Sequence, residues 1–169
     1  MKDNFYVFLD IDGVLNNQDF LLSYRSNNRK GSYILDFAKH SVDALNHLIK
    51  ELQINYSVNL VISSSWRINM PETIQTLQNN GVYFPPTPVT STIKETFENS
   101  RGNEIATYLK QVNETSNFVI IDDEWFDFKD KFYRKNIIKT DFYKDGLTKK
   151  QVQEFLQYIE NKLEQEQKQ

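Results

Sequence analysis

Three short apolar runs, each followed directly by polar residues, limit the possible folds of this 169-residue chain more than any other feature. The runs span residues 5–9, 58–62 and 118–121, and they are rich in β-branched and aromatic residues. Such continuous apolar runs are typical of strands that are buried on both faces of a parallel sheet. Ile137 and Ile138 predict a fourth, short strand.

Segments with helical periodicity separate the predicted strands. Ser41 is expected to cap a helix whose apolar residues follow at helical spacing, and residues 71–81 and 102–112 predict two more helices. Thr148 and Gln151 form a capping-box pattern at the start of the last helix. Strands that alternate with helices predict an α/β fold, a doubly wound, Rossmann-like parallel sheet with helices on both faces.

The length and the apolar content of 39% predict a single domain over residues 1–169, because the chain can build one core but is too short to expect two. Two segments, 16–39 and 83–100, do not follow the alternation of strands and helices. We interpret both as loops that frame a binding site at the carboxyl ends of the strands.

The charge balance excludes some classes of function. A net charge of −3 is not that of a nucleic-acid coat protein or of a membrane-surface binder, although a local basic patch is not excluded.

Cysteine is absent, which excludes disulfides, thiolate nucleophiles and cysteine-ligated zinc. The first predicted strand begins near residue 5 and no apolar run reaches membrane-spanning length, so we expect a soluble, cytoplasmic protein without a signal peptide. No obligate protein partner is evident.

Two carboxylates follow the first predicted strand on a tight turn. Asp10 and Asp12 flank Ile11, and Gly13 allows the backbone angles that such a turn needs. A carboxylate can attack phosphorus in line, while a neighbouring carboxyl group protonates the leaving oxygen and then activates water. The same pattern also occurs in ordinary acidic turns and in calcium loops. It therefore indicates phosphoryl transfer only together with other signals.

A second acidic pair, Asp122 and Asp123, follows the third predicted strand. The carboxyl ends of parallel strands converge, so we expect this pair to lie near Asp10 and Asp12. Adjacent negative charges that face a phosphate need a cation, and carboxylate oxygens suit Mg²⁺. Asp127 is either an added metal ligand, or a carboxylate that supports the ligands from behind, or a residue that faces solvent on a short helix.

These motifs resemble those of the haloacid dehalogenase (HAD) superfamily of phosphatases. The turn at Asp10 resembles its first motif, Ser63 at the end of a strand resembles its second, and the pair at residues 122–123 resembles its fourth. The third motif is a Lys or Arg that neutralises an aspartyl phosphate. Arg101 is the favoured match because it begins the helix before the acidic strand, and Lys94 is the alternative.

The resemblance implies a role for each matching residue. Asp10 would be the nucleophile, Asp12 the general acid and then the general base, and Ser63 and Arg101 would stabilise charge on the phosphoryl oxygens. The predicted Mg²⁺ ligands are Asp10, the Asp12 backbone carbonyl, Asp123 and, directly or from behind the other ligands, Asp122.

The residues after the second strand add candidate substrate contacts. Ser64 is either a second phosphate donor or a helix cap. Arg67 either pairs with a phosphate or is a surface cation, and Trp66 either stacks on a base or packs as an ordinary aromatic residue. Together with Lys94, Ser64 and Arg67 are the predicted substrate-binding residues.

Five segments resemble, more narrowly, the HAD domain of Swiss-Army-knife RNA-repair proteins and the phosphatase domain of polynucleotide kinase-phosphatases. The segments are Asp-Ile-Asp-Gly-Val-Leu-Asn from residue 10, Ile-Ser-Ser-Ser-Trp-Arg from 62, Arg-Gly-Asn-Glu-Ile from 101, Ile-Asp-Asp from 121 and Asp-Gly-Leu-Thr from 145. The resemblance covers about residues 5–150. It implies a phosphatase that removes phosphate from RNA or DNA ends, by analogy a 3′-phosphatase.

The same motifs are compatible with three further functions. In the superfamily a large cap domain restricts the site to small molecules, but segments 16–39 and 83–100 are shorter than the roughly 40 residues that an independent domain needs. An open site favours a macromolecular phosphate end, although a loop could still select a free nucleotide. The chain could also be a magnesium-binding signalling module, against which Asp12 argues. It could finally be a catalytically inactive binding protein, against which Asp10, Asp12 and the later acidic pair argue together.

Overall fold

The secondary-structure elements alternate as the sequence predicts. The computed structural model describes residues 2–27, 37–93, 100–114, 116–125, 127–128, 131–166 and 168. In chain order the elements are β1 (Asn4–Leu9), α1 (Gln18–Asn27), α2 (Lys39–Asn55), β2 (Ser57–Ile62), the 3-10 helix η1 (Ser65–Asn69), α3 (Met70–Asn79), β3 (Thr90–Ser91), α4 (Arg101–Gln111), β4 (Phe118–Asp122), the 3-10 turn η2 (Arg134–Asn136), β5 (Ile137–Lys139) and α5 (Lys149–Glu166).

The strands form one parallel sheet in the order β3-β2-β1-β4-β5. On one side of β1 the sheet continues with β2 and then β3. On the other side β4 pairs with β1, and β5 pairs with β4. Ligands of such sheets bind at the carboxyl ends of the strands where the strand order reverses, which here is between β1 and β4. The predicted doubly wound α/β fold is therefore confirmed.

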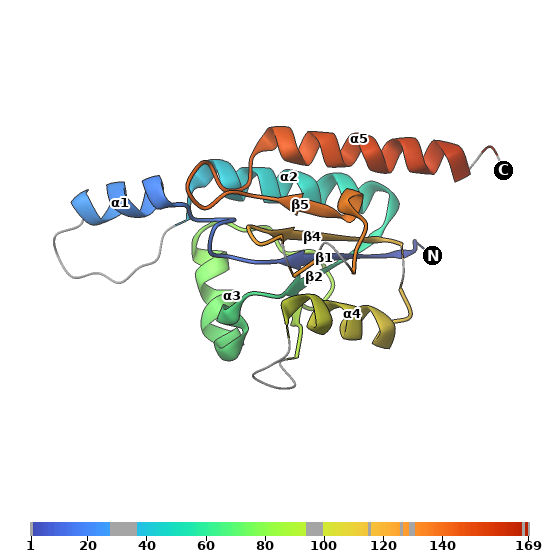
Figure 1. Cartoon of the computed structure of the whole chain (residues 1–169), viewed down its shortest axis with the longest axis horizontal. Helices are drawn as coiled ribbons and strands as arrows, with labels where there is room; N and C mark the ends of the chain where they lie inside the picture. Colours follow the sequence, from blue (N-terminus) through green and yellow to red (C-terminus); the bar gives the residue numbers. More distant parts are fainter. Residues whose placement is uncertain are drawn as a thin grey trace.

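Helices cover both faces of the sheet. In Figure 1, α2 and α5 lie together over one face and α4 lies over the opposite face. Leu9 and Ile121 pack in the apolar core under α2 and α5, whereas their neighbours Phe8 and Ile120 pack in the core under α4. The strands β1, β2, β4 and β5 contribute residues to both cores, which explains why they appear as continuous apolar runs in the sequence.

The two predicted helix caps have different outcomes. Ala38 holds the N-cap position of α2 without a side-chain hydrogen bond. Ser41 lies buried inside the first turn, where its Oγ donates to the Asp145 carbonyl oxygen at 3.3 Å, so the prediction that Ser41 caps the helix was wrong. The capping box of α5 is confirmed, because the Thr148 N–H donates to Gln151 Oε1 at 2.9 Å and the Gln151 N–H donates back to Thr148 Oγ1 at 3.3 Å.

The segment 16–39 is not entirely a loop. Helix α1 occupies part of it and extends beyond the end of the sheet in Figure 1, so the loop prediction was wrong for those residues. Its apolar residues 20–22 are consecutive, and no stripe at helical spacing indicated a helix. Residues 28–36 lie outside the described part of the chain. In the segment 83–100, residues 94–99 lie outside it, and the remainder contains only the edge strand β3.

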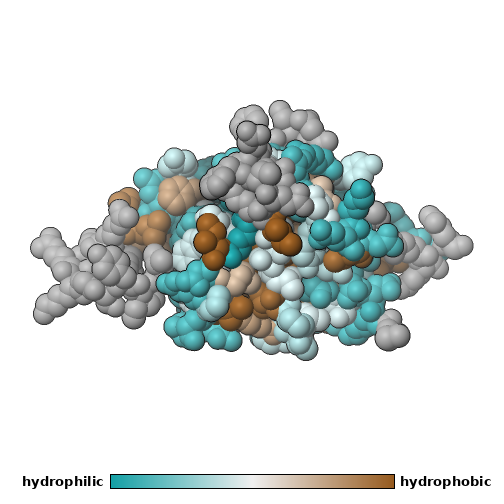
Figure 2. Space-filling model, turned by 90° about the horizontal axis from the view of Figure 1, so that it is seen from below, coloured by the Kyte–Doolittle hydropathy of each residue, from teal (hydrophilic) through white to brown (hydrophobic). Residues whose placement is uncertain are grey.

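The described residues contain no folded cap domain, in agreement with the prediction. The face of the molecule on the α4 side is mainly hydrophilic, with small, separate hydrophobic areas (Figure 2). Among the residues that the structure describes, no helix combines the length and the apolar character needed to cross a membrane.

Candidate active site

Asp10 follows β1 directly and starts a tight turn over the carboxyl end of the sheet. Its backbone N–H donates to the carbonyl oxygen of Ile121 on β4 at 3.0 Å, which ties the turn to the neighbouring strand. Gly13 has φ +76°, and a Cβ at this position would collide with the Asp123 carboxylate. Glycine is therefore required here both for its backbone angle and for the close approach of the turn to Asp123.

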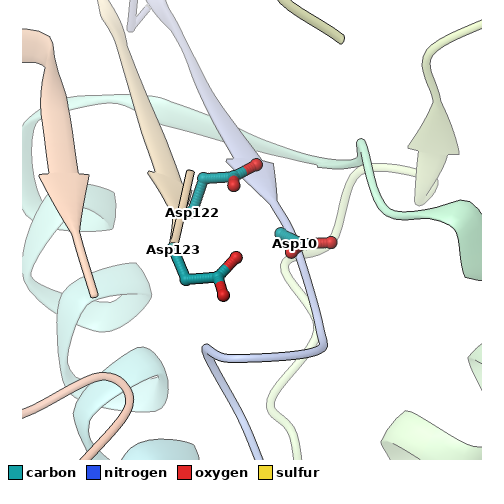
Figure 3. Close-up of side chains that lie close together, drawn as sticks. All are labelled: Asp10, Asp122 and Asp123. Atoms are coloured by element: carbon teal, nitrogen blue, oxygen red, sulfur yellow. The ribbon is translucent and has the colours of Figure 1, made fainter. Parts of the chain in front are cut away.

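Three carboxylates meet where the strand order reverses. Asp10 comes from the end of β1, and Asp122 and Asp123 come from the end of β4 (Figure 3). One carboxylate oxygen from each residue lies within 4.8 Å of the other two. Asp10 and Asp122 are only 3% and 0% exposed, and Asp123 is half-buried. A cluster of hard oxygen donors of this kind fits Mg²⁺.

Burial, together with the neighbouring negative charges, raises the pKa of all three carboxyl groups. Burial raises the pKa of Asp10, and the nearby Arg101 and a hydrogen bond from Ser64 only partly oppose the shift. Burial and the adjacent Asp10 raise the pKa of Asp122 to about 7, and the same causes raise the pKa of Asp123. A divalent cation bound among them would favour the ionised forms of all three carboxyl groups.

Arg101, the first residue of α4, contacts two of these carboxylates. Its Nη1 lies 3.1 Å from Asp10 Oδ2 and 2.6 Å from Asp122 Oδ2. Burial alone would lower the pKa of Arg101, but the Asp122 and Asp10 carboxylates outweigh burial and raise this pKa. The favoured cation of the third motif therefore lies at Asp10, whereas Lys94 lies outside the described residues.

Ser63 and Ser64 follow β2 and are both buried. Ser63 Oγ has no hydrogen-bond partner among the residues that the structure describes, although it is shielded from solvent. A buried hydroxyl without a partner is costly, and a phosphoryl oxygen would satisfy it. Ser64 hydrogen-bonds Asp10 through its side chain and also accepts a long hydrogen bond, 3.5 Å, from the Trp66 N–H. The two hydroxyls thus lie at the predicted site.

The carboxylate of Asp12 is held by two side chains that no sequence pattern assigns to it. Trp66 Nε1 donates to Asp12 Oδ2 at 2.9 Å, and Asn16 Nδ2 donates to Asp12 Oδ1 at 2.9 Å. Asn16 also accepts from the Gly13 N–H at 3.1 Å. The Asp12 carboxylate is exposed and is not one of the three clustered carboxylates, and its predicted contact with the metal is made through its backbone carbonyl alone.

Arg67 is held by partners within the protein, and its predicted role in substrate binding stays a prediction. Its Nη1 donates to the carbonyl oxygens of Ser63 and Ser64, at 2.8 Å each. Its Nη2 donates to both carboxylate oxygens of Glu104 on α4, at 3.0 and 2.8 Å. These bonds use the four N–H groups of Nη1 and Nη2, and they connect the loop that carries both serines to the helix that carries Arg101.

Asp127 also supports α4. Its Oδ2 accepts from the backbone N–H of Gly102 at 3.1 Å, in the first turn of the helix, where a negative charge is favoured. Asp127 is therefore not a member of the carboxylate cluster, and it lies next to Arg101, where a supporting role behind the metal ligands stays a prediction. It also lines a hollow of about 370 Å³ beside Arg101, together with Glu124 and Phe128.

The family described as the HAD domain in Swiss Army Knife RNA repair proteins matches residues 6–152. The match includes every residue of the site described above. No curated protein and no solved structure matches the chain.

Proposed function

Because the chain belongs to the family of HAD domains in Swiss Army Knife RNA repair proteins, we propose that it is a Mg²⁺-dependent phosphatase that removes phosphate from nucleic-acid ends through an aspartyl phosphate. One observation carries the proposal. Asp10 lies within 4.8 Å of two further carboxylates and 3.1 Å from the Arg101 guanidinium, so a nucleophile, a cation-binding cluster and a fixed positive charge share one site.

The reaction would have two steps, both at Asp10. A carboxylate oxygen of Asp10 attacks phosphorus, the bond from phosphorus to the leaving oxygen breaks, and Asp12 gives its proton to that oxygen. Asp12 then takes a proton from water, the water oxygen attacks phosphorus, and the bond between Asp10 and phosphorus breaks to release inorganic phosphate. Arg101 and the free Ser63 hydroxyl would stabilise the phosphoryl oxygens in both steps.

The site fits Mg²⁺ by its donors, which are hard carboxylate oxygens. Asp10, Asp123 and the Asp12 backbone carbonyl would hold the ion, which would neutralise charge on the transferring phosphoryl group. Asp122 Oδ2 accepts from Arg101 at 2.6 Å and its Oδ1 accepts from the Glu124 N–H at 2.9 Å. This pairing supports a role for Asp122 as the partner of Arg101, behind the direct ligands.

The choice of substrate rests on two supports. The family is described as a domain of RNA repair proteins, whose substrates are nucleic acids. The described residues also contain no cap domain that would close the site over a small molecule. A terminal phosphate on a strand, and in particular a 3′-phosphate, is therefore the proposed substrate. A free nucleotide is the alternative that the experiment must separate.

The test is phosphate release from matched oligonucleotides that carry a 3′-phosphate, a 5′-phosphate or no phosphate, beside nucleoside monophosphates. We expect release from the 3′-phosphorylated strand that is lost with EDTA and restored with Mg²⁺. Asp10→Asn should lower this activity by at least about 1,000-fold because the nucleophile is absent, whereas the exposed Asp19→Asn should retain it.

The outcomes are distinct. Turnover of free nucleotides alone would assign the protein to small-molecule chemistry. Substantial activity of Asp10→Asn would contradict the assignment of the nucleophile, and the absence of turnover on every substrate would favour a binding or signalling module.

A further inference from the structure

Positive charge is concentrated in one segment of this acidic chain. Residues 129–150 contain eight Lys and Arg against three Asp, a local charge of +5 in a chain whose net charge is −3. The positive charge is therefore local to this segment, and the rest of the chain carries a net negative charge. This segment attracts a polyanion to one place while the rest of the surface repels it.

Three of these cations lie along the free edge of the sheet, on β5 and the turn before it. Arg134, Lys135 and Lys139, which we call the basic edge, are exposed and line a hollow of about 380 Å³ between β5 and α5. Glu154 also lines this hollow, 3.9 Å from Lys150. Within the described part of the chain, no member of the basic edge forms an ion pair with a carboxylate.

One end of the basic edge lies next to the candidate active site: Lys139 ends β5, whereas Arg134 and Lys135 precede β5 and lie toward the amino ends of the strands. Lys139 is paired in register with Asp122, the last residue of β4. The Arg134 guanidinium lies 4.8 Å from the ring centre of Trp125, which follows Asp123 by two residues. A strand whose terminal phosphate is bound at Asp10 would therefore meet Lys139 next to the carboxylate cluster, and then Arg134 and Lys135 farther along the edge of the sheet.

Aromatic rings are interleaved with these cations. Tyr133 is 77% exposed, and Lys135 Nζ lies 5.5 Å from its ring centre and 5.4 Å from that of Tyr158. Cations that follow a backbone, next to rings on which bases can stack, are the usual means of binding single-stranded nucleic acid without sequence preference. An acidic peptide would need the cations but not the exposed ring, and a duplex keeps its bases stacked on each other.

We propose that the basic edge, with Tyr133, binds the strand that precedes the terminal phosphate of a single-stranded nucleic acid. This inference rests on the proposed function for the direction of the strand, because Asp10 fixes where the phosphate lies. The candidate active site would bind only the terminal phosphate. The basic edge would bind the nucleotides that precede it.

Binding is measured with the Asp10→Asn protein, which holds substrate without turning it over, and a fluorescent single-stranded 3′-phosphorylated oligonucleotide. The variant replaces Arg134, Lys135 and Lys139 by Gln. The control replaces Lys50, Lys110 and Lys168 by Gln, which removes the same charge from exposed positions elsewhere. We expect the first variant to bind at least about tenfold more weakly than the control.

The salt dependence gives a second readout. Each phosphate contact to a single strand contributes about −0.7 to the slope of log K against log salt, so losing three contacts should reduce the slope by about 2. Tyr133→Ala, with the charges intact, should weaken binding by about five- to tenfold through lost stacking. Its salt slope should stay unchanged.

Equal affinities and equal slopes for the variant and the control would overturn the proposal, as would tighter binding to a duplex or to polyglutamate of the same charge. Activity separates this failure from failure of the proposed function. In the protein with Asp10 intact, the variant should lose kcat/KM on the oligonucleotide while p-nitrophenyl phosphate turnover stays unchanged. Strong binding to the basic edge without any phosphate release would contradict the proposed function alone.

Discussion

At the scale of single residues, the contacts around Asp12 give the proposed general acid a fixed position. Trp66 Nε1 and Asn16 Nδ2 donate to its two carboxylate oxygens, and Trp66 also packs against Phe37 with ring centres 5.9 Å apart. An exposed carboxylate would otherwise sample several rotamers. Trp66 is therefore a positioning residue that acts through Asp12, and not an ordinary core aromatic.

Trp66→Phe keeps an aromatic ring but removes the N–H. We expect kcat/KM on an alkyl phosphate to fall by about tenfold, because a hydrogen bond to a charged group contributes roughly 1.5–3 kcal/mol. The loss on p-nitrophenyl phosphate should be much smaller, since that leaving group needs no proton. An equal loss on both substrates would show that Trp66 serves only the general structure of the site.

The residues that the proposed chemistry requires were indicated by the sequence, but their hydrogen-bond partners were not. Asp10, Ser63 and Asp122 were found because each follows a recognisable strand, and parallel strands bring their carboxyl ends together. The bond from Trp66 to Asp12 joins positions 54 residues apart in the sequence. No local pattern records a pairing of this kind, which depends on how the strands and loops pack.

At the scale of elements, the Arg67–Glu104 pair connects the loop after β2 to α4. Glu104 is 3% exposed, so the pair is a buried one, and Arg67 bonds the two serine carbonyls at the same time. The two elements that would contact the phosphoryl group are thus fixed relative to each other. The sequence did not indicate this pairing, because it shows a cation but not the buried carboxylate that neutralises it.

Glu104→Ala would leave the Arg67 guanidinium without its carboxylate in a buried position. We expect this change to lower the free energy of unfolding by about 3–5 kcal/mol, measured by urea denaturation at pH 7. Glu72→Ala, at an exposed position in the first turn of α3, is the matched control. A loss no larger than that of the control would show that the pair does not brace the two elements.

Elements differ in how clearly the sequence indicates them. The strands β1, β2 and β4 are buried on both faces and therefore appear as continuous apolar runs. Helix α1 has no apolar stripe at helical spacing, and β3 has only two residues, so neither could be predicted from periodicity. The elements that the sequence did not indicate, α1 and β3, lie in the two segments around the site. The elements that it did indicate form the sheet on which the site lies.

At the scale of the whole molecule, the fold places the carboxylates of the candidate active site, and the positive charge lies on a neighbouring part of the surface. The reversal of strand order between β1 and β4 gathers the carboxylates, and β5 beside them carries the basic edge. A net charge of −3 conceals this separation, because charge balance counts residues without regard to place. The central claim is that Asp10 becomes phosphorylated during turnover.

The most direct test is mass spectrometry of the Asp12→Asn variant after brief reaction with p-nitrophenyl phosphate, Mg²⁺ and an acid quench. The aryl leaving group needs no proton, so the first step should proceed, while the loss of the general base should slow the hydrolysis and allow the phosphorylated protein to accumulate. We predict one added phosphoryl group on Asp10 and none in a variant that also carries Asp10→Asn. A phosphoryl group on another residue, or turnover by the wild-type protein with no phosphorylated Asp10 under any quench, would contradict the account.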